Sequence, residues 1–379
     1  MNIAFLTSEY PHPKIANSAG IGTSIKNLAL ALVSKGHKVT IFVYSENCEA
    51  VFQEKNITIH KIAYKKYPMF SWFFYRKKIQ NYINAIIKKD AIDLIEAPDW
   101  TGITAFMKFK CPLVIRMHGT DAYFCSLEGR KQKVKNYIFE KIALKSANHI
   151  VSVSEFTAIK TKKIFKLKND ITVIHNGIDT QYFSPSLEKV EPNTILYFGS
   201  IIRKKGVLEL ASIFNEVTKR NTKAKLILIG HDVKDILEQK STRTLFEQKL
   251  TIQAKNNVQF IEKVTYYKIK DYISKSSVVV LPSFAEAFPM TWLEAMAMGK
   301  ALVTSNIGWA NELMVIEETG FMISPSNHKK YAEKINKLLA DAKLNSKFGT
   351  NARERIEENF SNQIIVEKNI KFYQSILKK

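Results

Sequence analysis

The sequence of 379 residues predicts an α/β protein made of two doubly wound domains, each a parallel sheet covered by helices. Short apolar runs suited to buried strands alternate with longer helical stretches along the whole chain. The length suits two domains, and the character of the chain changes at residues 175–185, a turn-rich segment followed by polar residues. We therefore expect domains at residues 1–185 and 186–361, with a ligand-binding cleft between them.

Ten strands are expected, in chain order, from apolar runs that end in polar, glycine or proline residues. The first domain supplies Ile3–Thr7, Val39–Tyr44, Leu113–Met117, Ile150–Val153 and Thr172–His175. The second supplies Ile195–Phe198, Leu226–Ile229, Val258–Ile261, Val278–Leu281 and Ala301–Thr304. Helices such as Thr23–Ser34 and Val207–Thr218 lie between them.

Composition limits the class of protein. Hydrophobic residues make up 46% of the chain, as in ordinary globular proteins, and no apolar run is long enough to span a bilayer. The first residues lack a basic region and contain an early acid, Glu9, so they indicate a strand rather than a signal peptide. Cys48, Cys111 and Cys125 form no metal or redox spacing, and we expect a reduced, cytoplasmic location.

A net charge of +22 needs an explanation. Residues 65–78 interleave aromatic rings with cations, as membrane-surface elements do, and residues 130–145 are a second basic segment. Three interpretations stay open: an anionic membrane surface, a lysine-rich composition without a partner, and nucleic acid. No zinc-finger spacing, RNP-like strand or helix-turn-helix supports the last, so we expect no nucleic-acid partner.

The most informative segment surrounds Glu286 and Glu294. Glu286 lies in a loop after the strand Val278–Leu281, and Glu294 lies about one turn into the helix that follows. Ligands of open α/β sheets bind at such strand ends, and the free amides of a helix start suit a phosphate. Carboxylates can accept hydrogen bonds from the vicinal hydroxyls of a sugar. The segment therefore fits a nucleotide carrying a sugar, the alternative being a surface helix with solvated glutamates.

Two further strand ends carry candidate ligand groups. Arg203, Lys204 and Lys205 follow the strand Ile195–Phe198, and such cations can neutralise a diphosphate leaving group without a metal. His118 follows the strand Leu113–Met117, where it could touch a bound sugar. In both cases a structural role, as a solvated charge run or a structural histidine, stays open.

Near the start of the chain, Gly20 opens a helix after the first strand and would allow close approach of a phosphate or sugar. The third glycine of the dinucleotide fingerprint is missing, so a helix-opening turn without a ligand is the alternative. No two aspartates are spaced as Asp-x-Asp, and no zinc-protease, Walker or nucleophile-elbow motif occurs. We expect no metal and no cofactor.

With these features assembled, the chain resembles a retaining glycosyltransferase of family four, which has the GT-B fold. The resemblance covers essentially the whole length. Its motifs are the loop at Gly20, His118–Gly119, Asn176–Asp179 with Phe183, Gly199 with Lys205–Gly206, Glu286 to Glu294, Gly320–Phe321 and the closing helix after Phe360–Ser361.

The resemblance implies roles for the site residues. Glu294 would hold the ribose, Glu286 and His118 the donor sugar, and Lys205 the diphosphate that Gly20 approaches. Backbone groups across Phe288, Pro289, Met290 and Thr291 would contact sugar or phosphate. We take Glu286, His118 and Lys205 as catalytic and the others as donor-binding. The resemblance also implies that a final helix, Asn362–Leu377, returns to the first domain.

Two positions depart from the family pattern. Ser200 stands where relatives have arginine, and we predict that Arg203 supplies the missing charge. Glu262 stands near the base-binding loop where relatives commonly have glycine, which leaves the base open; family frequency favours UDP.

The expected reaction is transfer of a sugar from a nucleotide sugar to a hydroxyl of a growing or lipid-linked glycan, with retained configuration, in cell-surface polysaccharide synthesis. The enzyme would be a hexosyltransferase of class EC 2.4, cytoplasmic or peripheral on the inner face of the membrane. A non-hydrolysing nucleotide-sugar epimerase and a non-enzymatic membrane or nucleic-acid binding protein are the alternatives.

Overall fold

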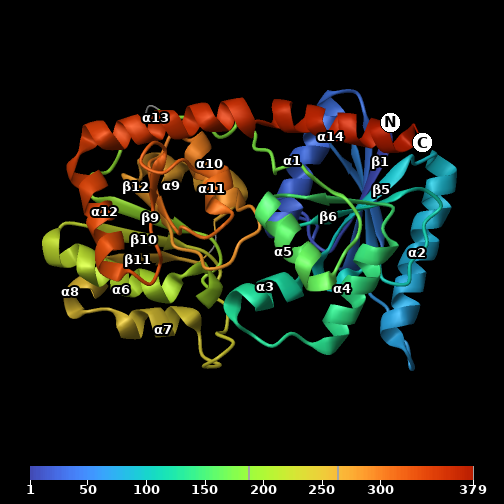
Figure 1. Cartoon of the computed structure of the whole chain (residues 1–379), viewed down its shortest axis with the longest axis horizontal. Helices are drawn as coiled ribbons and strands as arrows, with labels where there is room; N and C mark the ends of the chain where they lie inside the picture. Colours follow the sequence, from blue (N-terminus) through green and yellow to red (C-terminus); the bar gives the residue numbers. More distant parts are fainter. Residues whose placement is uncertain (187, 263, 379) are drawn as a thin grey trace. The chain divides into compact units, whose positions relative to one another are not determined.

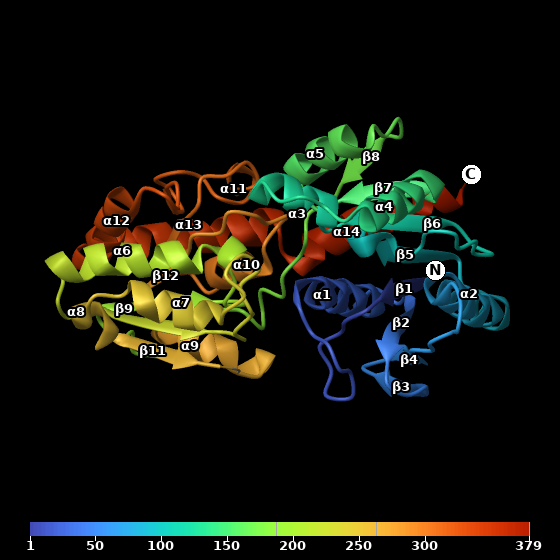
Figure 2. The ribbon, with the colours of Figure 1, turned by 90° about the horizontal axis from the view of Figure 1, so that it is seen from below.

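A computed structural model describes residues 1–186, 188–262 and 264–378 (Figure 1). The chain forms two compact units, residues 1–177 with 362–379, and residues 178–361. Each is an α/β structure with one sheet and helices on both faces (Figures 1 and 2). The predicted fold class is confirmed.

The first unit contains an eight-stranded sheet in the order β3-β4-β2-β1-β5-β6-β7-β8. All neighbours pair in parallel except β3 and β4, which are antiparallel. The strands are β1 (Asn2–Thr7), β2 (Lys38–Glu46), β3 (Ala50–Glu54), β4 (Ile57–Ala63), β5 (Leu94–Pro98), β6 (Leu113–Met117), β7 (His149–Ser152) and β8 (Ile171–Val173). The helices are α1 (Gly20–Ser34), α2 (Ser71–Asp90), α3 (Asp121–Glu128), α4 (Val134–Ser146), α5 (Glu155–Phe165) and α14 (Asn362–Leu377), with a 3₁₀ turn η1 (Trp100–Gly102).

Alternation along β1 divides the core of this unit into two layers. Ile3 and Phe5 point to one face of the sheet and pack with apolar residues of α1 and α14. Ala4 and Leu6 point to the other face and pack with residues of α2 and α4. A strand that is buried on both faces reads as a continuous apolar run, which is why β1 was recognisable from sequence.

The second unit contains a six-stranded sheet in the order β11-β10-β9-β12-β13-β14, parallel throughout. The strands are β9 (Thr194–Phe198), β10 (Lys225–Ile229), β11 (Val258–Ile261), β12 (Val278–Leu281), β13 (Leu302–Thr304) and β14 (Gly320–Met322). The helices are α6 (Val207–Arg220), α7 (Thr242–Lys249), α8 (Ile252–Lys255), α9 (Ile269–Lys275), α10 (Met290–Ala297), α11 (Ala310–Leu313), α12 (His328–Ala340) and α13 (Ala342–Asn359), with 3₁₀ turns η2 (Arg203–Lys205) and η3 (Tyr266–Lys268).

All ten predicted strands are present with their ends shifted by at most two residues, and four more are found: β3, β4, β5 and β14. Of these, β5 matters most, because it lies at the centre of the first sheet beside β1. It contains Glu96, an acid inside a buried strand, and this acid pairs with Arg116 of β6 at 2.7 Å. Because Glu96 interrupts the apolar run, this strand was not predicted from the sequence.

The division between the units lies at 177/178, eight residues before the predicted boundary at 185/186. Local contacts explain the difference. Ile178 forms a bridge with Ser361, and the guanidinium of Arg353 donates to the carbonyl oxygens of Thr180 and Phe183 at 2.9 and 2.7 Å. Residues 178–185 are therefore held by the end of the second unit.

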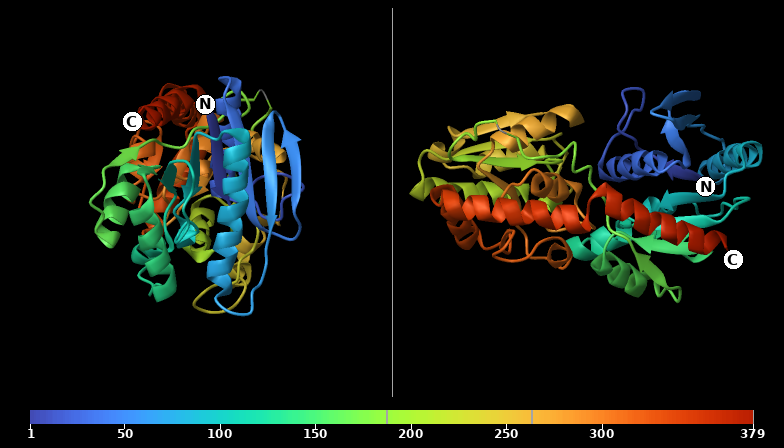
Figure 3. Two further views of the ribbon diagram at one scale, coloured as in Figure 1. Left: turned by 90° about the vertical axis from the view of Figure 1, so that its right-hand side faces the viewer. Right: turned by 90° about the horizontal axis from the view of Figure 1, so that it is seen from above.

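The final helix α14 spans Asn362–Leu377, as predicted, and it belongs to the first unit. It lies against α1 (Figure 3). Its Tyr373 hydroxyl donates to Glu96 at 2.7 Å, and its Asn369 accepts from Arg116 at 2.5 Å. The last residues of the chain thus satisfy the buried ion pair of β5 and β6.

Candidate active site

In the second unit, the predicted donor site lies where the sheet changes direction. The chain runs from β9 outward to β10 and β11, and then returns to place β12 on the other side of β9. The loops after β9 and β12 therefore leave the same edge of the sheet, and the chain continues from them in opposite directions. Ligands of open α/β sheets usually bind at such a point. Lys205 lies after β9, and Glu286 and Glu294 lie after β12.

The backbone holds these two loops together. The amide of Phe284 donates to the carbonyl of Lys204 at 2.8 Å. Gly206 adopts a positive φ of 70°, and a Cβ there would lie 1.9 Å from the carbonyl oxygen of Pro282. Only glycine fits this approach, so the glycine after the basic cluster has a packing role as well as a turn role.

Lys205 and Glu286 form an ion pair, with Nζ 2.5 Å from Oε1. Both side chains are largely buried, at 20% and 10% exposure. The two residues predicted to bind diphosphate and sugar are thus brought together, and the charge of each neutralises that of the other. A ligand carrying both an anion and hydroxyl groups could replace this contact with two complementary ones.

Glu294 lies on α10 and is 4% exposed. Burial raises the pKa of its carboxyl to about 8, while the hydroxyl of Tyr266 and the charge of Lys205 act in the opposite direction. The carboxyl therefore carries a proton over much of the neutral range. Lys205 influences both glutamates, so the three predicted residues form one cluster.

Tyr266 was not predicted from sequence. It lies in η3 after β11 and stacks on Tyr182 with ring centroids 6.5 Å apart and planes 15° apart. Its hydroxyl interacts electrostatically with the carboxyl of Glu294, and burial raises the pKa of this hydroxyl. The tyrosines at 182 and 266 are far apart in sequence, and neither has a local pattern that separates it from a core aromatic.

The start of α10 completes this part of the site. No side chain caps the helix, whose preceding residue is Pro289. Thr291, in its first turn, has its methyl group 4.0 Å from the position a Cβ would take on Gly199. The predicted residues Phe288, Pro289, Met290 and Thr291 thus lead into a helix terminus beside the loop after β9, with its positive dipole end available to an anion.

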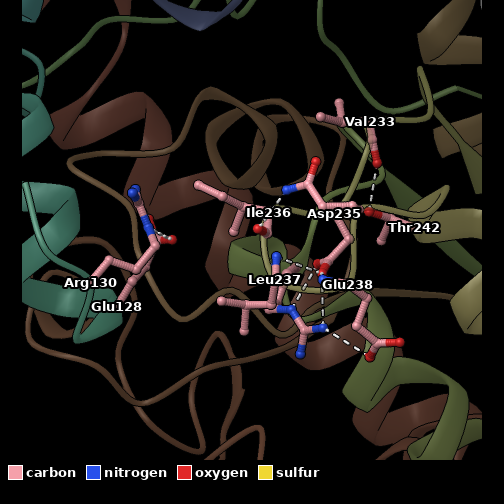
Figure 4. Close-up of polar contacts among 10 residues, drawn as sticks. Glu128, Arg130, Val233, Asp235, Ile236, Leu237, Glu238 and Thr242 are labelled. Carbon is pink, nitrogen blue, oxygen red and sulfur yellow. Dashed lines mark hydrogen bonds and ion pairs between the residues drawn. The ribbon is translucent and has the colours of Figure 1, made fainter. Parts of the chain in front are cut away.

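Arg203 makes other contacts. Its guanidinium donates to both carboxylate oxygens of Asp235, at 2.7 and 3.1 Å, and to Glu238 at 3.4 Å. Asp235 also accepts from the amides of Leu237 and Glu238 (Figure 4). The charge of Arg203 is thus taken up by the loop after β10, and its predicted donor role stays a prediction.

In the first unit, the start of α1 is capped by an acidic side chain, a role that was not predicted from the sequence. Glu9, directly after β1, accepts from the amide of Gly22 at 2.7 Å. Burial raises the pKa of this carboxyl. Gly20 itself is exposed, with open space where a Cβ would lie. Glu9 therefore caps α1 at Gly22, two residues beyond the point where Gly20 could approach a phosphate.

His118 follows β6 in the same unit. Its backbone amide donates to Asp99 at 2.9 Å, and Asp99 is fully buried after β5. Burial, with the nearby charge of Glu140, raises the pKa of Asp99 to about 8. Burial and Arg116 lower the pKa of His118 to about 3, so its ring is neutral at physiological pH and can act as a hydrogen-bond partner rather than a cation.

In the parts of the chain that the structure describes, no three His, Cys, Asp or Glu side chains are grouped so that they could hold a metal ion.

Comparison with known proteins decides the family. Residues 18–182 match the family described as Glycosyltransferase Family 4, and residues 179–355 match Glycosyl transferases group 1. The chain belongs to the family four glycosyltransferases. It is accordingly an enzyme of the glycosyl-transferring class, as the sequence predicted, rather than an epimerase or a binding protein.

Individual relatives agree with this assignment. A capsular polysaccharide biosynthesis glycosyltransferase of Staphylococcus aureus is 30% identical over 64% of this chain and 65% of its own. The structure of a sucrose-phosphate synthase from Thermosynechococcus elongatus superposes with a TM-score of 0.81 at 20% identity over the full length of both chains. Anabaena HepE in complex with UDP-glucose gives 0.74 at 17% identity over 98% and 99% of the two chains. The fold is the GT-B fold.

Proposed function

We propose that this glycosyltransferase moves a sugar from a UDP-sugar to a hydroxyl of a growing or lipid-linked glycan in cell-surface polysaccharide synthesis, with retained anomeric configuration and without a metal. The cluster of Lys205, Glu286 and Glu294 at the switch point of the second sheet carries the proposal. HepE, a structural neighbour, was solved with UDP-glucose, which supports UDP as the nucleotide. The staphylococcal relative acts in capsule synthesis, which supports a surface polysaccharide.

Each site residue has a defined task in this proposal. Glu294 accepts hydrogen bonds from the ribose hydroxyls, and Glu286 accepts them from the donor sugar. Lys205 then turns from Glu286 to the diphosphate, where, with the amides at the start of α10, it stabilises the charge of the departing UDP. His118 hydrogen-bonds to the donor sugar, and Gly20 lets the diphosphate approach α1. No side chain of this cluster is needed as a nucleophile, so the acceptor hydroxyl attacks from the face that UDP leaves.

Two substitutions test the division of labour between the acids. Glu294→Ala should weaken binding of UDP and of every UDP-sugar by a similar factor, measured by calorimetry. Glu286→Ala should leave UDP binding nearly unchanged and weaken UDP-sugars according to their sugar. An equal loss of free UDP binding in both variants would contradict the assignment.

Arg203 provides a separate test. If it supplies the charge that Ser200 lacks, Arg203→Ala should lower both UDP-sugar affinity and turnover. Unchanged affinity and turnover would leave Arg203 with the structural role that its contacts with Asp235 describe.

A further inference from the structure

One surface of the first unit combines exposed rings with unpaired cations. It lies where the start of α2 meets the segment after η1. We call its residues the aromatic–basic patch: Met69, Phe70, Phe73, Phe74 and Phe106, with the lysines Lys65, Lys66 and Lys77. Met69 and Phe70 are 69% and 62% exposed, Phe74 is 45% exposed and Phe106 37%. Exposed apolar side chains gathered in this way mark an interaction site rather than ordinary surface.

Phe73, Phe74 and Phe106 are held in place by contacts with other aromatic rings. Trp72 joins the patch to the core, with ring centroids 5.5 Å from Phe106 and 4.8 Å from Phe139 of α4. Phe73 packs edge-on against Phe74 at 5.7 Å. Phe70 and Phe106 both have positive φ, 46° and 65°, which bulky residues rarely adopt. The fold therefore accepts backbone strain at two of the exposed rings.

The charge around the patch has one sign. No aspartate or glutamate occurs at residues 64–89 or 100–120. Lys65, Lys66, Lys77 and Lys108 have no carboxylate within salt-bridge distance among residues 1–186, 188–262 and 264–378. Lys78, by contrast, pairs with Glu49 at 2.6 Å. Lysines without a nearby carboxylate, next to exposed apolar side chains, fit a partner that has both anionic groups and hydrocarbon chains.

An apolar groove continues the patch inward. It encloses about 550 Å³ and is lined by Phe73, Phe106, Met107 and Ile142, with Lys77 and Lys108 also in its wall. The amine of Lys77 lies 5.4 Å from the ring centre of Phe73 and donates to the carbonyl of Phe106. A groove with apolar walls and two lysines in its lining offers contacts to both parts of a lipid, the acyl carbon and the phosphate.

We propose that the aromatic–basic patch docks the enzyme on an anionic lipid bilayer, with the rings at the headgroup level and the lysines against lipid phosphates. The docking surface is argued from its own residues. It rests on the proposed function only in one respect: transfer to a lipid-linked glycan explains why the enzyme would work at a membrane. Nucleic acid fits less well, because stacking needs free ring faces. Here Lys77 covers Phe73, Lys65 covers Tyr67 at 5.3 Å, and Phe74 and Phe106 pack on neighbouring rings. No helix among the described residues is long and apolar enough to cross a membrane, so the contact would be peripheral.

The test is co-sedimentation of the full chain with vesicles of phosphatidylcholine alone or with part of it replaced by phosphatidylglycerol. Binding should require the anionic lipid and fall with salt. Lys65→Glu with Lys66→Glu should reduce it roughly tenfold or more, since each lysine near an anionic surface contributes severalfold. Phe70→Asn with Phe74→Ser should reduce binding by a similar factor; asparagine tolerates the backbone at position 70 and can cap α2.

Matched controls come from the second unit. Lys343→Glu with Lys347→Glu makes the same charge change on exposed residues of α13, and Ile252→Ser removes an apolar side chain that is 86% exposed. Both controls should bind vesicles like the unchanged chain. Equal binding to neutral and anionic vesicles, equal losses in controls and patch variants, or binding to RNA in place of vesicles would each overturn the proposal.

UDP binding, measured on the same preparations, separates this inference from the proposed function. If the patch variants no longer bind vesicles but still bind UDP, the docking surface is supported, and UDP binding shows that the variants are folded. A chain that binds anionic vesicles through the patch but binds no UDP would refute the proposed donor and leave the surface standing. A chain that binds UDP but no vesicles would refute the docking surface and leave the proposed donor standing.

Discussion

Glu294 is the residue whose ionisation changes most on folding within the donor site. Its pKa rises from 4.5 to about 8 because the carboxyl is buried. Between these values the unfolded chain loses the proton while the folded one keeps it, so this group makes the free energy of unfolding fall as pH rises from about 5 to 8. The slope is at most about 1.4 kcal/mol per pH unit.

Glu294→Gln should remove that contribution. In urea titrations across this range, the variant should lose less stability with rising pH than the unchanged chain does. Asp99, with a pKa of about 8, adds a similar slope that the substitution leaves in place. Glu247, which pairs with Arg243 on α7, supplies a matched control, because Glu247→Gln makes the same chemical change outside the donor site. This control should lose more stability with rising pH than Glu294→Gln does. Parallel profiles for Glu294→Gln and Glu247→Gln would show that Glu294 ionises normally.

Lys205 and Lys204 are neighbours with different surroundings. Lys205 reaches Glu286, whereas the backbone of Lys204 supports the loop after β12. Lys205→Ala should lower kcat by about 10² to 10³ while leaving the fold intact, because it removes charge stabilisation from the leaving group. Lys204→Ala should change kcat by far less. Donor turnover measured for both would contradict the assignment if the two losses were equal.

At the scale of the element, the helix α1 begins under a tight constraint. A Cβ on Gly22 would lie 2.8 Å from the carbonyl oxygen of Glu9, which is backbone and cannot rotate away. Gly22→Ala should therefore cost about 1–3 kcal/mol of stability. Gly20→Ala, two residues earlier in open space, should be neutral or slightly stabilising. Thermal unfolding of the two variants gives the comparison, and equal midpoints would refute the constraint.

Elements with local signals were predictable. The strand β12 and the helix α10 were read from an apolar run, a proline and a terminating glycine, all within a few residues of one another. The carboxylates at 286 and 294 could be placed because they lie within that same span. Lys205 joined them because strands ending at one edge of a parallel sheet bring their loops together.

Elements stabilised by distant residues were not predictable. In strand β5, Glu96 pairs with Arg116 and accepts a hydrogen bond from Tyr373 of the last helix. Neither partner can be predicted from the residues next to Glu96 in the sequence. The hairpin of β3 and β4 turns through Lys55 and Asn56, both with positive φ and without the glycine that usually marks such a turn. Glu9 and Tyr266 were missed for the same reason, since their partners are set by tertiary structure.

At the scale of the whole molecule, the last helix decides which residues complete the first unit. Removal of residues 362–379 would leave Arg116 and Glu96 without Asn369 and Tyr373, and would uncover the apolar residues of α1. We expect hydrogen exchange to lose protection in α1 and β1, while the strands of the second unit stay protected. Equal loss in both units would show that they unfold as one. Tyr373→Phe offers a milder version, with an expected cost of about 1–3 kcal/mol in the first unit.

The same arrangement has a consequence for synthesis. A ribosome releases residues 178–361, a complete unit, before it releases the helix that the first unit needs. Proteins usually fold from the amino end as they emerge. In this chain the earlier-made half must wait, with one face of its sheet lacking part of its cover, until residues 362–377 have been made as well.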